Sequence, residues 1–416
     1  MKVCIHRGTQ EVGGTCIEIE SRGKRIALDV GLPLDGADSI DSLPPVEGFR
    51  DPDESLLAVV ISHPHLDHYG LARYLLPGIQ MVMGAATERI LNASTLFTPT
   101  GMKFTNVLHL DPLKPLSIGP FTIAPYLNDH SAYDAYSLLI SADGQRLFYS
   151  GDFRGHGRKS VLFEQFLNSP PSAVDVLLME GTTIGRTGSE SKFKTEQELE
   201  HCFGEHIRDS KGMVLVWASR QNIDRLVTIF KACMKSGRQL ILDMYTAEIL
   251  RVTGNPKLPQ ADWNGIKVFL PWSQKQKIVR EGEFDLAERY KAARIYPEQL
   301  ARDADHSVML FRPSMTRDLE KTQCLQGATL IYSLWTGYLG REVNRTFREW
   351  LKARGIPLVH CHTSGHASPQ DLQRFAKAIA PKMLVPIHSF ATDRFHSYFE
   401  NVSMKNDGQW WEVSYA

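Results

Sequence analysis

Alternating apolar and polar positions open the chain and predict paired strands. Such alternation covers Cys16–Glu20, and after the turn Ser21–Lys24 a second predicted strand covers Arg25–Val30 and ends at Gly31. Two runs of this kind joined by a short turn with glycine predict a β-hairpin. The next run, Leu56–Ile61, is apolar at every position, which is typical of a strand buried on both faces.

Further along, the order of predicted helices and strands changes twice. Up to about residue 195 we predict helices at Leu71–Leu76 and Ala85–Leu96, and strands at Thr122–Leu127, Gln145–Ser150 and Val174–Met179. Helices and strands then alternate, which predicts βαβ units on a parallel sheet. These are Glu196–Asp209, Met213–Trp217, Asn222–Ser236, Gln239–Asp243, Ser307–Phe311 and Thr329–Tyr332. The segment Gly254–Gly282 shows no clear pattern.

After Gly355 the pattern of the first part of the chain resumes, which predicts that the middle part is an inserted domain. The returning segments are a strand at Pro357–His360, a helix at Pro369–Ile379 and a strand at Met383–Ile387. We therefore expect one α/β domain built from residues 1–195 and 356–416, interrupted by a second α/β domain at residues 196–355. A chain of 416 residues is long enough for two hydrophobic cores.

Charge and composition narrow the class of protein. Lys and Arg total 47, as do Asp and Glu, so no overall basic field indicates nucleic-acid binding, and a polyanion would need a local patch or metal ions. No apolar stretch approaches the roughly 20 residues that span a bilayer, and no signal peptide is visible. The six cysteines include no CxxC pair, so we expect reduced, mostly buried thiols in a cytoplasmic protein.

The segment Ser62-His63-Pro64-His65-Leu66-Asp67-His68 carries the strongest chemical signal. It follows the buried strand Leu56–Ile61, and the end of such a strand is where open α/β sheets place their sites. In an extended segment His63 and His65 point the same way, whereas Asp67 and His68 follow on the turn. This arrangement predicts two metal ions side by side.

Three more residues that can bind metal follow predicted strands. They are His130, Asp152 and His388. In hydrolysis by two metal ions, one ion lowers the pKa of a water molecule, and the pair holds the attacking and leaving oxygens. Imidazole and carboxylate ligands suit Zn²⁺ or Mn²⁺, and one carboxylate must bridge the ions. We predict that Asp152 is this bridge.

These motifs together resemble the signature of the metallo-β-lactamase fold. They are His63-x-His65-x-Asp67-His68, His130 and Tyr149-Ser150-Gly151-Asp152. The resemblance implies an αββα sandwich that holds two metals at one edge. Asp29, just before Gly31, matches an early aspartate of the family that orients the metal loop.

The second half of the chain resembles the β-CASP group of this fold, which includes ribonuclease J and the nucleases of messenger-RNA 3′ processing. The matching features are Glu180, Ser364-Gly365-His366-Ala367-Ser368 and Pro386-Ile387-His388-Ser389. The resemblance implies a metal-dependent nuclease with an inserted β-CASP domain. Histidine at the last motif is more similar to the RNA-processing members than to the Artemis-like DNA branch.

The resemblance also implies a role for each site residue. His63, His65 and His130 would hold one metal, Asp67, His68 and His388 the other, with Asp152 between them. We expect Asp67, His366 and Glu180 to take part in catalysis. His366 would bind the scissile phosphate or protonate the leaving oxygen, and Glu180 would orient it. Two ions are expected, Zn²⁺ before Mn²⁺.

Substrate contacts and rival functions complete the predictions. We expect Ser219, Arg220, Ser333 and His366 to contact nucleic acid, although Arg220 also suits a surface beside a helix cap. His360, Cys361 and His362 are interpreted as core or loop residues. The rivals are a small-molecule ester, lactone or thioester hydrolase of the same fold and a non-catalytic β-CASP subunit. Ribonuclease J has a further C-terminal domain that supports oligomerisation, so we do not carry its tetramer over and consider a homodimer.

Overall fold

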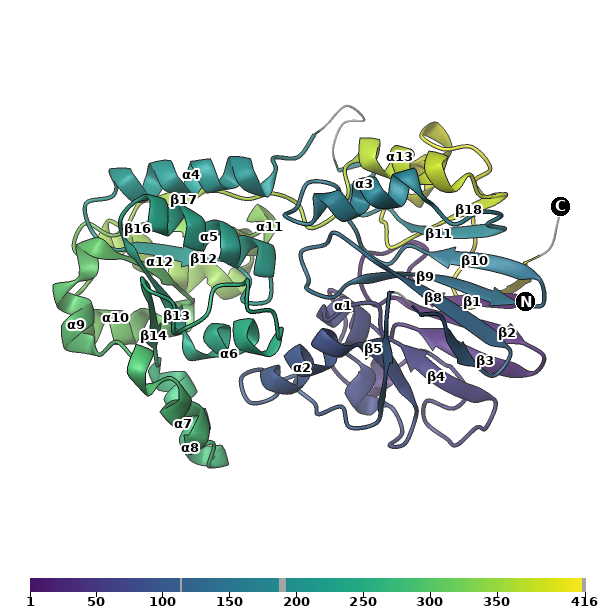
Figure 1. The fold of residues 1–416 in the computed structure, drawn as a ribbon, viewed down its shortest axis with the longest axis horizontal. Coiled ribbons are helices and arrows are strands. Elements are labelled where there is room, and N and C mark those ends of the chain that lie inside the picture. Colours follow the sequence, from purple (N-terminus) through teal and green to yellow (C-terminus); the bar gives the residue numbers. More distant parts are fainter. Residues whose placement is uncertain (113, 187–191, 414–416) are drawn as a thin grey trace. The chain divides into compact units, whose positions relative to one another are not determined.

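The computed structural model describes residues 1–112, 114–186 and 192–413. The chain divides into two compact units (Figure 1). Unit 1 comprises Met1–Asn92, Met102–Lys192 and Gly365–Ala416, and unit 2 comprises Ala93–Gly101 and Phe193–Ser364. The domain boundary predicted at residue 195 lies close to Phe193, where the long segment of unit 2 begins. The boundary predicted at residue 355 lies before Ser364, where that segment ends.

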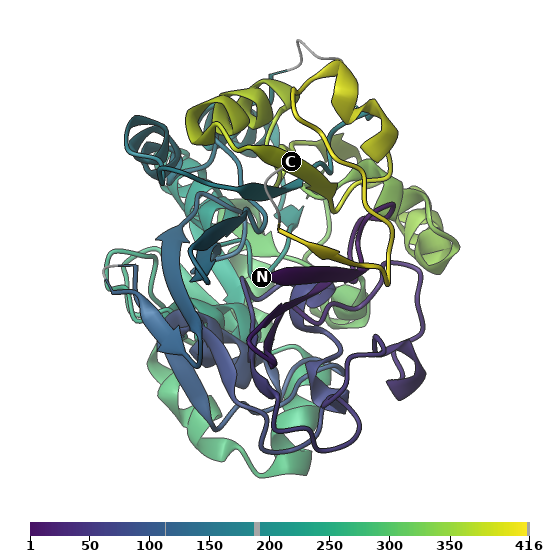
Figure 2. The same cartoon turned by 90° about the vertical axis from the view of Figure 1, so that its right-hand side faces the viewer.

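Unit 1 contains two sheets. The first has the order β19-β1-β2-β3-β4-β5-β6, and Figure 2 shows β19 beside β1 near the termini. Its strands are β1 (Lys2–Arg7), β2 (Cys16–Ser21), β3 (Lys24–Leu28), β4 (Leu56–Val60), β5 (Met81–Gly84), β6 (Val107–Leu110) and β19 (Trp410–Glu412). The second sheet, ordered β18-β11-β10-β9-β8-β7, contains β7 (Leu116–Ile118), β8 (Phe121–Leu127), β9 (Tyr136–Ala142), β10 (Gln145–Tyr149), β11 (Val176–Glu180) and β18 (Met383–Ile387).

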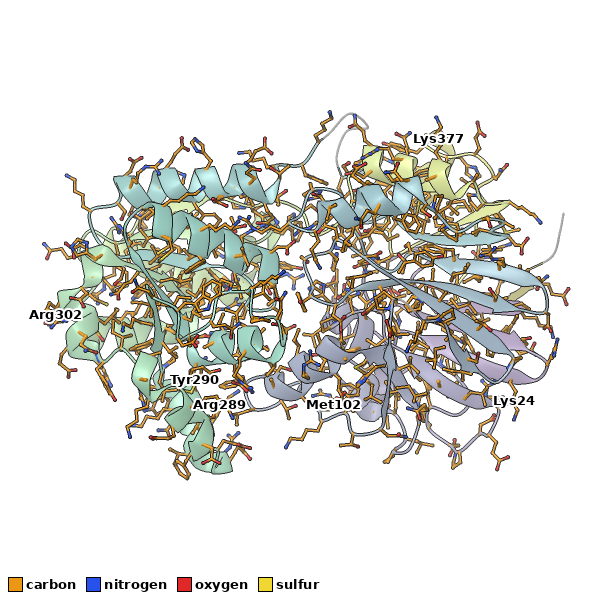
Figure 3. The ribbon with its side chains drawn as sticks, viewed as in Figure 1. Lys24, Met102, Arg289, Tyr290, Arg302 and Lys377 are labelled. Carbon is orange, nitrogen blue, oxygen red and sulfur yellow. A yellow bond between two sulfur atoms is a disulfide. The ribbon has the colours of Figure 1, made fainter. Side chains whose placement is uncertain are left out.

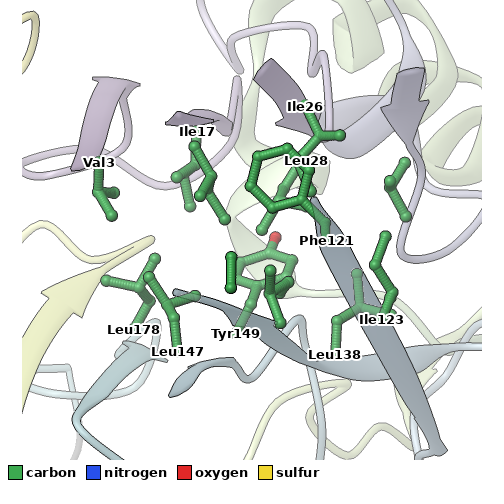
Figure 4. Close-up of a cluster of buried hydrophobic side chains, with 14 of the residues drawn as sticks. Val3, Ile17, Ile26, Leu28, Phe121, Ile123, Leu138, Leu147, Tyr149 and Leu178 are labelled. Atoms are coloured by element: carbon green, nitrogen blue, oxygen red, sulfur yellow. The ribbon is translucent and has the colours of Figure 1, made fainter. Parts of the chain in front are cut away.

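The two sheets of unit 1 enclose one apolar core. Figure 4 shows Val3, Ile17 and Leu28 of the first sheet facing Phe121 and Leu178 of the second. Helices cover the outer face of each sheet and bury the strand residues that point away from the shared core. These helices are α1 (Leu66–Tyr69) and α2 (Ala85–Ser94) on the first sheet, and α3 (Ser160–Asn168) and α13 (Pro369–Ile379) on the second. The predicted αββα sandwich is confirmed.

Unit 2 is built on one parallel sheet ordered β14-β13-β15-β12-β16-β17. Its strands are β12 (Val214–Trp217), β13 (Gln239–Asp243), β14 (Ile266–Phe269), β15 (Ser307–Leu310), β16 (Thr329–Tyr332) and β17 (Leu358–His360). Its helices are α4 (Glu196–Asp209), α5 (Ile223–Lys235), α6 (Met244–Val252), α7 (Trp272–Glu281), α8 (Phe284–Arg289), α9 (Pro297–Arg302), α10 (Thr316–Thr322), α11 (Thr336–Gly340) and α12 (Arg345–Arg354). Helices α4 and α5 lie side by side (Figure 1), and α10 and α12 contribute to an apolar core with the sheet. The predicted inserted α/β unit is therefore present.

Charged side chains line the outside of each unit. Lys24, Arg302 and Lys377, labelled in Figure 3, are exposed. Among the residues that the structure describes, no helix is both long and apolar enough to cross a membrane.

Two local predictions differ from the structure. The helix expected at Leu71–Leu76 is wrong, because only the 3-10 turn η2 (Ala72–Tyr74) forms there. The N–H of Leu76 donates to the carbonyl of Phe49 at 3.1 Å instead of to the carbonyl of Ala72, so a distant segment takes a hydrogen bond that the expected helix would use. The unpatterned segment Gly254–Gly282 contains β14 and α7, and α7 buries little of its surface, which leaves a weak apolar period.

The cysteine prediction needs one correction. Cys202 and Cys361 form a disulfide across 159 positions of sequence, so they are not reduced thiols in this structure. The other cysteines are free and buried, as expected; they are Cys4, Cys16, Cys233 and Cys324. No local pattern marks the pair, because the fold of unit 2 brings α4 beside the end of β17.

Candidate metal centre

The residues predicted to bind metal follow strand ends that meet at one edge of unit 1. Strands β10, β11 and β18 run parallel, and β8 runs the same way because β9 is antiparallel to both β8 and β10. Asp152, Glu180 and His388 thus lie at or just beyond the carboxyl ends of neighbouring strands, and His130 follows β8. The opposing sheet contributes the loop after β4. Carboxyl ends of parallel strands are the usual place for a site in α/β folds.

Backbone hydrogen bonds hold the histidine-rich loop and its short helix in place. His65 has extended backbone angles and begins α1, which carries Asp67 and His68. The carbonyl of Asp67 accepts from the N–H of Thr15 at 3.2 Å, and that of His68 accepts from the N–H of Val30 at 2.8 Å. The loop is therefore fixed by the preceding hairpin rather than by its own helix, which is only one turn long.

Glycine is required where this loop meets the segment that follows β3. A Cβ atom at Gly31 would lie 1.8 Å from the carbonyl oxygen of Asp67 and 2.8 Å from the backbone nitrogen of Thr15. Both contacts are with backbone, so no side-chain rotation relieves them. Only a residue without a side chain lets the histidine-rich loop approach this closely.

Three imidazoles converge to form the first group of ligand atoms. Nδ1 of His65 lies 3.2 Å from Nε2 of His63 and 3.2 Å from Nε2 of His130. Burial lowers the pKa of all three rings, to about 4 for His65 and well below the usual value for the other two. The rings are therefore neutral at pH 7, which is the state in which imidazole binds a metal ion.

Two carboxylates and two imidazoles form the second group. Oδ2 of Asp67 lies 3.4 Å from Nε2 of His388 and 3.9 Å from Nε2 of His68. Asp152 completes the group, with Oδ2 at 3.3 Å from His68 Nε2 and Oδ1 at 3.6 Å from His388 Nδ1. One nitrogen or oxygen from each residue lies within 4.8 Å of those from the others.

Asp152 lies between the two groups. Its Oδ2 atom is 3.8 Å from His63 Nε2 in the first group and 3.3 Å from His68 Nε2 in the second. The carboxylate is buried, and within the described residues neither of its oxygens has a hydrogen-bond partner. The same holds for Nε2 of His68 and of His388. Buried polar atoms without partners are costly, so this cluster fits divalent cations that would contact all of them.

The charges of the second group also favour a cation. Burial raises the pKa of the Asp152 carboxyl, but nearby imidazoles, above all His388 and His68, outweigh it and lower the pKa well below the usual range. Burial lowers the pKa of His68, but the carboxylates of Asp152 and Asp29 raise it well above its usual value. The carboxylates therefore favour a positive charge, either a proton or a metal ion, at the position next to Nε2 of His68.

Asp29 orients one ligand from outside the cluster. Its Oδ2 atom accepts a hydrogen bond from Nδ1 of His68 at 2.7 Å, from the Ser62 hydroxyl at 2.8 Å and from the Tyr149 hydroxyl at 2.6 Å. Its Oδ1 atom accepts from the N–H of Ser62 at 2.7 Å. With its proton held at Nδ1, His68 directs Nε2 towards Asp152. The predicted orienting position of Asp29 agrees with these contacts.

His366 and Glu180 form a pair beside the cluster. Nδ1 of His366 lies 3.2 Å from Oε2 of Glu180 and 3.6 Å from Oδ2 of Asp152. Burial lowers the pKa of His366, but the charges of Glu180 and Asp152 outweigh it and raise the pKa to about 9. The side chain is 22% exposed, whereas those of Glu180 and Asp152 are 1% exposed. His366 is therefore a protonated ring at pH 7 that is partly accessible to solvent.

Comparisons with known proteins agree with this fold. The family model described as Beta-lactamase superfamily domain matches residues 35–202. This chain has the metallo-β-lactamase fold. A protein of unknown function from Enterococcus faecalis V583 has a crystal structure that matches this metallo-β-lactamase fold with a TM-score of 0.80, at 23% identity and over 99% of both chains. At that identity the likeness concerns the fold alone.

Curated relatives of this metallo-β-lactamase fold protein carry the name ribonuclease J. That of Sinorhizobium meliloti (strain Sm2011) is 23% identical over 373 residues, which cover 87% of this chain and 62% of the relative. That of Helicobacter pylori (strain B128) is 20% identical over 405 residues, which cover 93% of this chain and 56% of the relative. The predicted resemblance to ribonuclease J is confirmed, and the chain spans 56–62% of the length of these two relatives.

The residues predicted to contact substrate in unit 2 lie in different surroundings. Arg220 pairs with Asp243 at 2.5 Å, and its side chain is 20% exposed. The Ser219 hydroxyl accepts a long hydrogen bond, 3.4 Å, from the N–H of Gln221, next to the cap of α5. Ser333 is buried, and its hydroxyl donates to the carbonyl of Cys361 at 2.5 Å. These contacts hold the Ser333 hydroxyl inside unit 2, and its predicted contact with substrate stays a prediction.

Sequence reasoning missed some residues that support the site. The Thr182 hydroxyl lies 3.0 Å from Nδ1 of His388, and Ser62 lies 3.0 Å from Nδ1 of His63 through its hydroxyl oxygen. Ser62 directly precedes the histidine motif, and Thr182 lies two positions after Glu180. The only sequence signal for these supporting residues is a short polar side chain beside a predicted ligand or strand end. Such residues are common, so this signal alone carries little information.

Proposed function

We propose that this chain is a dinuclear metal-dependent nuclease that hydrolyses phosphodiester bonds of nucleic acid, RNA in preference to DNA. The observation that carries the proposal is the arrangement of two ligand groups joined by Asp152, with the His366–Glu180 pair beside them. Its resemblance to proteins named ribonuclease J over most of the chain supports the choice of nucleic acid.

Each ligand group would hold one divalent ion. We assign His63, His65 and His130 to one ion and Asp67, His68 and His388 to the other, with Asp152 contacting both. The first group is purely imidazole, which suits Zn²⁺, and the mixed second group suits Zn²⁺ or Mn²⁺. The bound ions would lower the pKa of water and neutralise charge on the phosphodiester.

The chain's own residues then bind and orient the phosphodiester. The protonated His366 ring places a positive charge next to the ligand cluster, where it attracts a phosphate oxygen. Its Nδ1 proton points to Glu180, and we assign the Nε2 proton to the phosphate or to the leaving oxygen, as a general acid. Glu180 itself accepts from the N–H groups of Phe153 and Thr182, at 3.3 Å and 3.2 Å, so the orienting carboxylate is itself fixed. Asp67 takes part in catalysis as a ligand.

Three predicted properties remain proposals. RNA preference rests on the resemblance to the RNA-processing members, and a cytoplasmic location and a homodimer rest on the sequence analysis alone. Ser219, Arg220 and Ser333 remain proposed contacts for nucleic acid.

The first experiment is hydrolysis of end-labelled single-stranded RNA and DNA by the metal-loaded protein. We expect cleavage of RNA that disappears in His63→Ala, because that variant removes a ligand of the first group. His109→Ala is the matched control, since His109 is a half-exposed surface histidine paired with Glu88 at 2.7 Å. The fragment ladder separates endonucleolytic from exonucleolytic cleavage.

The role of His366 needs a separate measurement. His366→Gln should lower kcat by about 10²–10⁴-fold, the range for loss of a general acid, while metal content stays at two ions per chain. Loss of an ion in this variant would show that His366 is a ligand and overturn the assigned roles.

Negative results on nucleic acid would also be informative. Hydrolysis of a chromogenic lactone or thioester, with neither polymer cleaved, would favour the small-molecule hydrolase. A chain that binds two ions but cleaves none of these substrates would favour a non-catalytic β-CASP subunit.

A further inference from the structure

A second cluster of metal-binding side chains lies in unit 2, and it contains the disulfide. Cys202 and His206 are one turn apart on α4, so they face the same side of the helix. Cys361 follows β17 and is bonded to Cys202, with a Cα–Cα distance of 6.4 Å. The two sulfur atoms and a ring nitrogen of His206 all lie within 4.8 Å of one another.

We propose that Cys202, His206 and Cys361 form a site for a thiophilic divalent cation such as Zn²⁺, which becomes available when the disulfide is reduced. This site is separate from the cluster in unit 1 and does not depend on the proposed nuclease function. It offers two sulfurs and one imidazole, a ligand set that favours zinc over magnesium or calcium. Water would complete four-coordination.

The spacing of the three residues suits this ion. Zinc–sulfur bonds of about 2.3 Å at a tetrahedral angle place two sulfurs about 3.8 Å apart, and a sulfur and an imidazole nitrogen about 3.6 Å apart. Opening the disulfide moves the sulfurs from bonding distance to this separation. Cys202 and His206 are half-buried, so a small reductant and a hydrated ion can reach the site, while the buried Cys361 shields its other side.

The chemistry of the switch balances with a thiol reductant. Two small-molecule thiols give up two electrons and two protons, form their own disulfide and leave Cys202 and Cys361 as thiols. Binding of Zn²⁺ then releases the two thiol protons to solvent, because the thiolate is the ligand. Oxidation by a small-molecule disulfide reverses both steps and expels the ion.

The position of the cluster indicates what it does for unit 2. It joins the first helix of the inserted segment to its last strand, close to Phe193 and Ser364, where the chain enters and leaves the unit. A disulfide closes this loop under oxidising conditions, and a zinc ion closes the same loop under reducing conditions. In both states the ends of the inserted segment are held together.

Cobalt binding tests the proposal directly. The protein is reduced with a phosphine, freed of reductant and metal, and titrated with Co²⁺ while its near-ultraviolet absorption is recorded. Thiolate–cobalt bonds give a charge-transfer band that ligands made only of imidazole and carboxylate do not give, so cobalt in the unit 1 cluster does not interfere. We expect the band in the reduced protein, and one bound ion fewer in the oxidised protein, which lacks the band.

Variants and controls decide the outcome. Cys202→Ser should abolish the band, and His206→Gln should weaken Co²⁺ binding by at least about tenfold, the minimum cost for loss of a partner at a metal site. His201→Gln, an exposed position on the same helix, and Cys233→Ser should match the wild type. Absence of the band in the reduced wild type, or its survival in Cys202→Ser, would overturn the proposal. If Cys202→Ser does not fold, the oxidised wild type provides the same comparison, because its Cys202 and Cys361 cannot form thiolates.

Discussion

Replacing Asp29 by asparagine tests whether a residue that binds no metal controls the affinity of one ligand group. Asp29 has a φ of 58°, a left-handed conformation that asparagine tolerates, so the change does not strain the backbone. The side chains also match in size. What changes is hydrogen bonding: Oδ2 accepts three hydrogen bonds and Oδ1 accepts one from the N–H of Ser62.

The structure sets the expected magnitudes. The amide oxygen best replaces Oδ2, which leaves the amide NH₂ facing the N–H of Ser62, donor against donor. An unsatisfied buried donor costs about 1–3 kcal/mol of stability. His68 then donates to a neutral amide instead of a carboxylate, and loss of such a partner lowers metal affinity about 10–100-fold, or about 1.4–2.7 kcal/mol.

Competition with a chromogenic chelator measures this effect. We expect the ion assigned to Asp67, His68 and His388 to bind about 10–100-fold more weakly. The affinity for the ion assigned to the other group should be nearly unchanged. Asp175→Asn is the control, because this carboxylate accepts from the N–H of Arg146 at 2.8 Å away from the cluster. Wild-type affinity for both ions in Asp29→Asn would refute the orienting role.

Three other perturbations test the surrounding structure. Gly31→Ala should reduce metal content, because its Cβ would lie 1.8 Å from the carbonyl oxygen of Asp67. In the control Gly340→Ala the new Cβ would meet nothing within 4 Å, so metal content should not change. Equal metal content in both variants would contradict the steric argument. Arg225→Ala should cost about 3–5 kcal/mol in urea unfolding, because it removes the guanidinium that pairs with the buried carboxylate of Glu196. A loss under about 1 kcal/mol would show that the pair contributes little. Removing divalent ions with a chelator should lower the melting temperature, since Zn²⁺ at 1,000 times its Kd adds about 4 kcal/mol, and an unchanged melting temperature would argue against folded-state binding.

Local patterns predicted those parts of the molecule whose determinants are close in sequence. The hairpin, the buried strand before the histidine motif and helix α4 follow from runs of a few residues. The expected helix at Leu71–Leu76 was wrong because the N–H of Leu76 donates to the carbonyl of Phe49, which belongs to a distant segment that local propensity does not register. Helix α7 escaped prediction for the opposite reason: it buries mainly Gln274 and Ile278, so it lacks a clear apolar period.

The sequence by itself determined the chemical types at the candidate metal centre and the strand ends that carry them. Histidine and aspartate within six positions after a buried strand leave little freedom, because the strand fixes where they emerge. Only the tertiary structure decided which atoms meet: Asp152 lies between two groups drawn from both sheets, and Asp29 selects the nitrogen that His68 presents. The same holds for Cys202 and Cys361, because the packing of distant segments places their sulfurs together. No pattern of neighbouring residues in the sequence predicts this pairing.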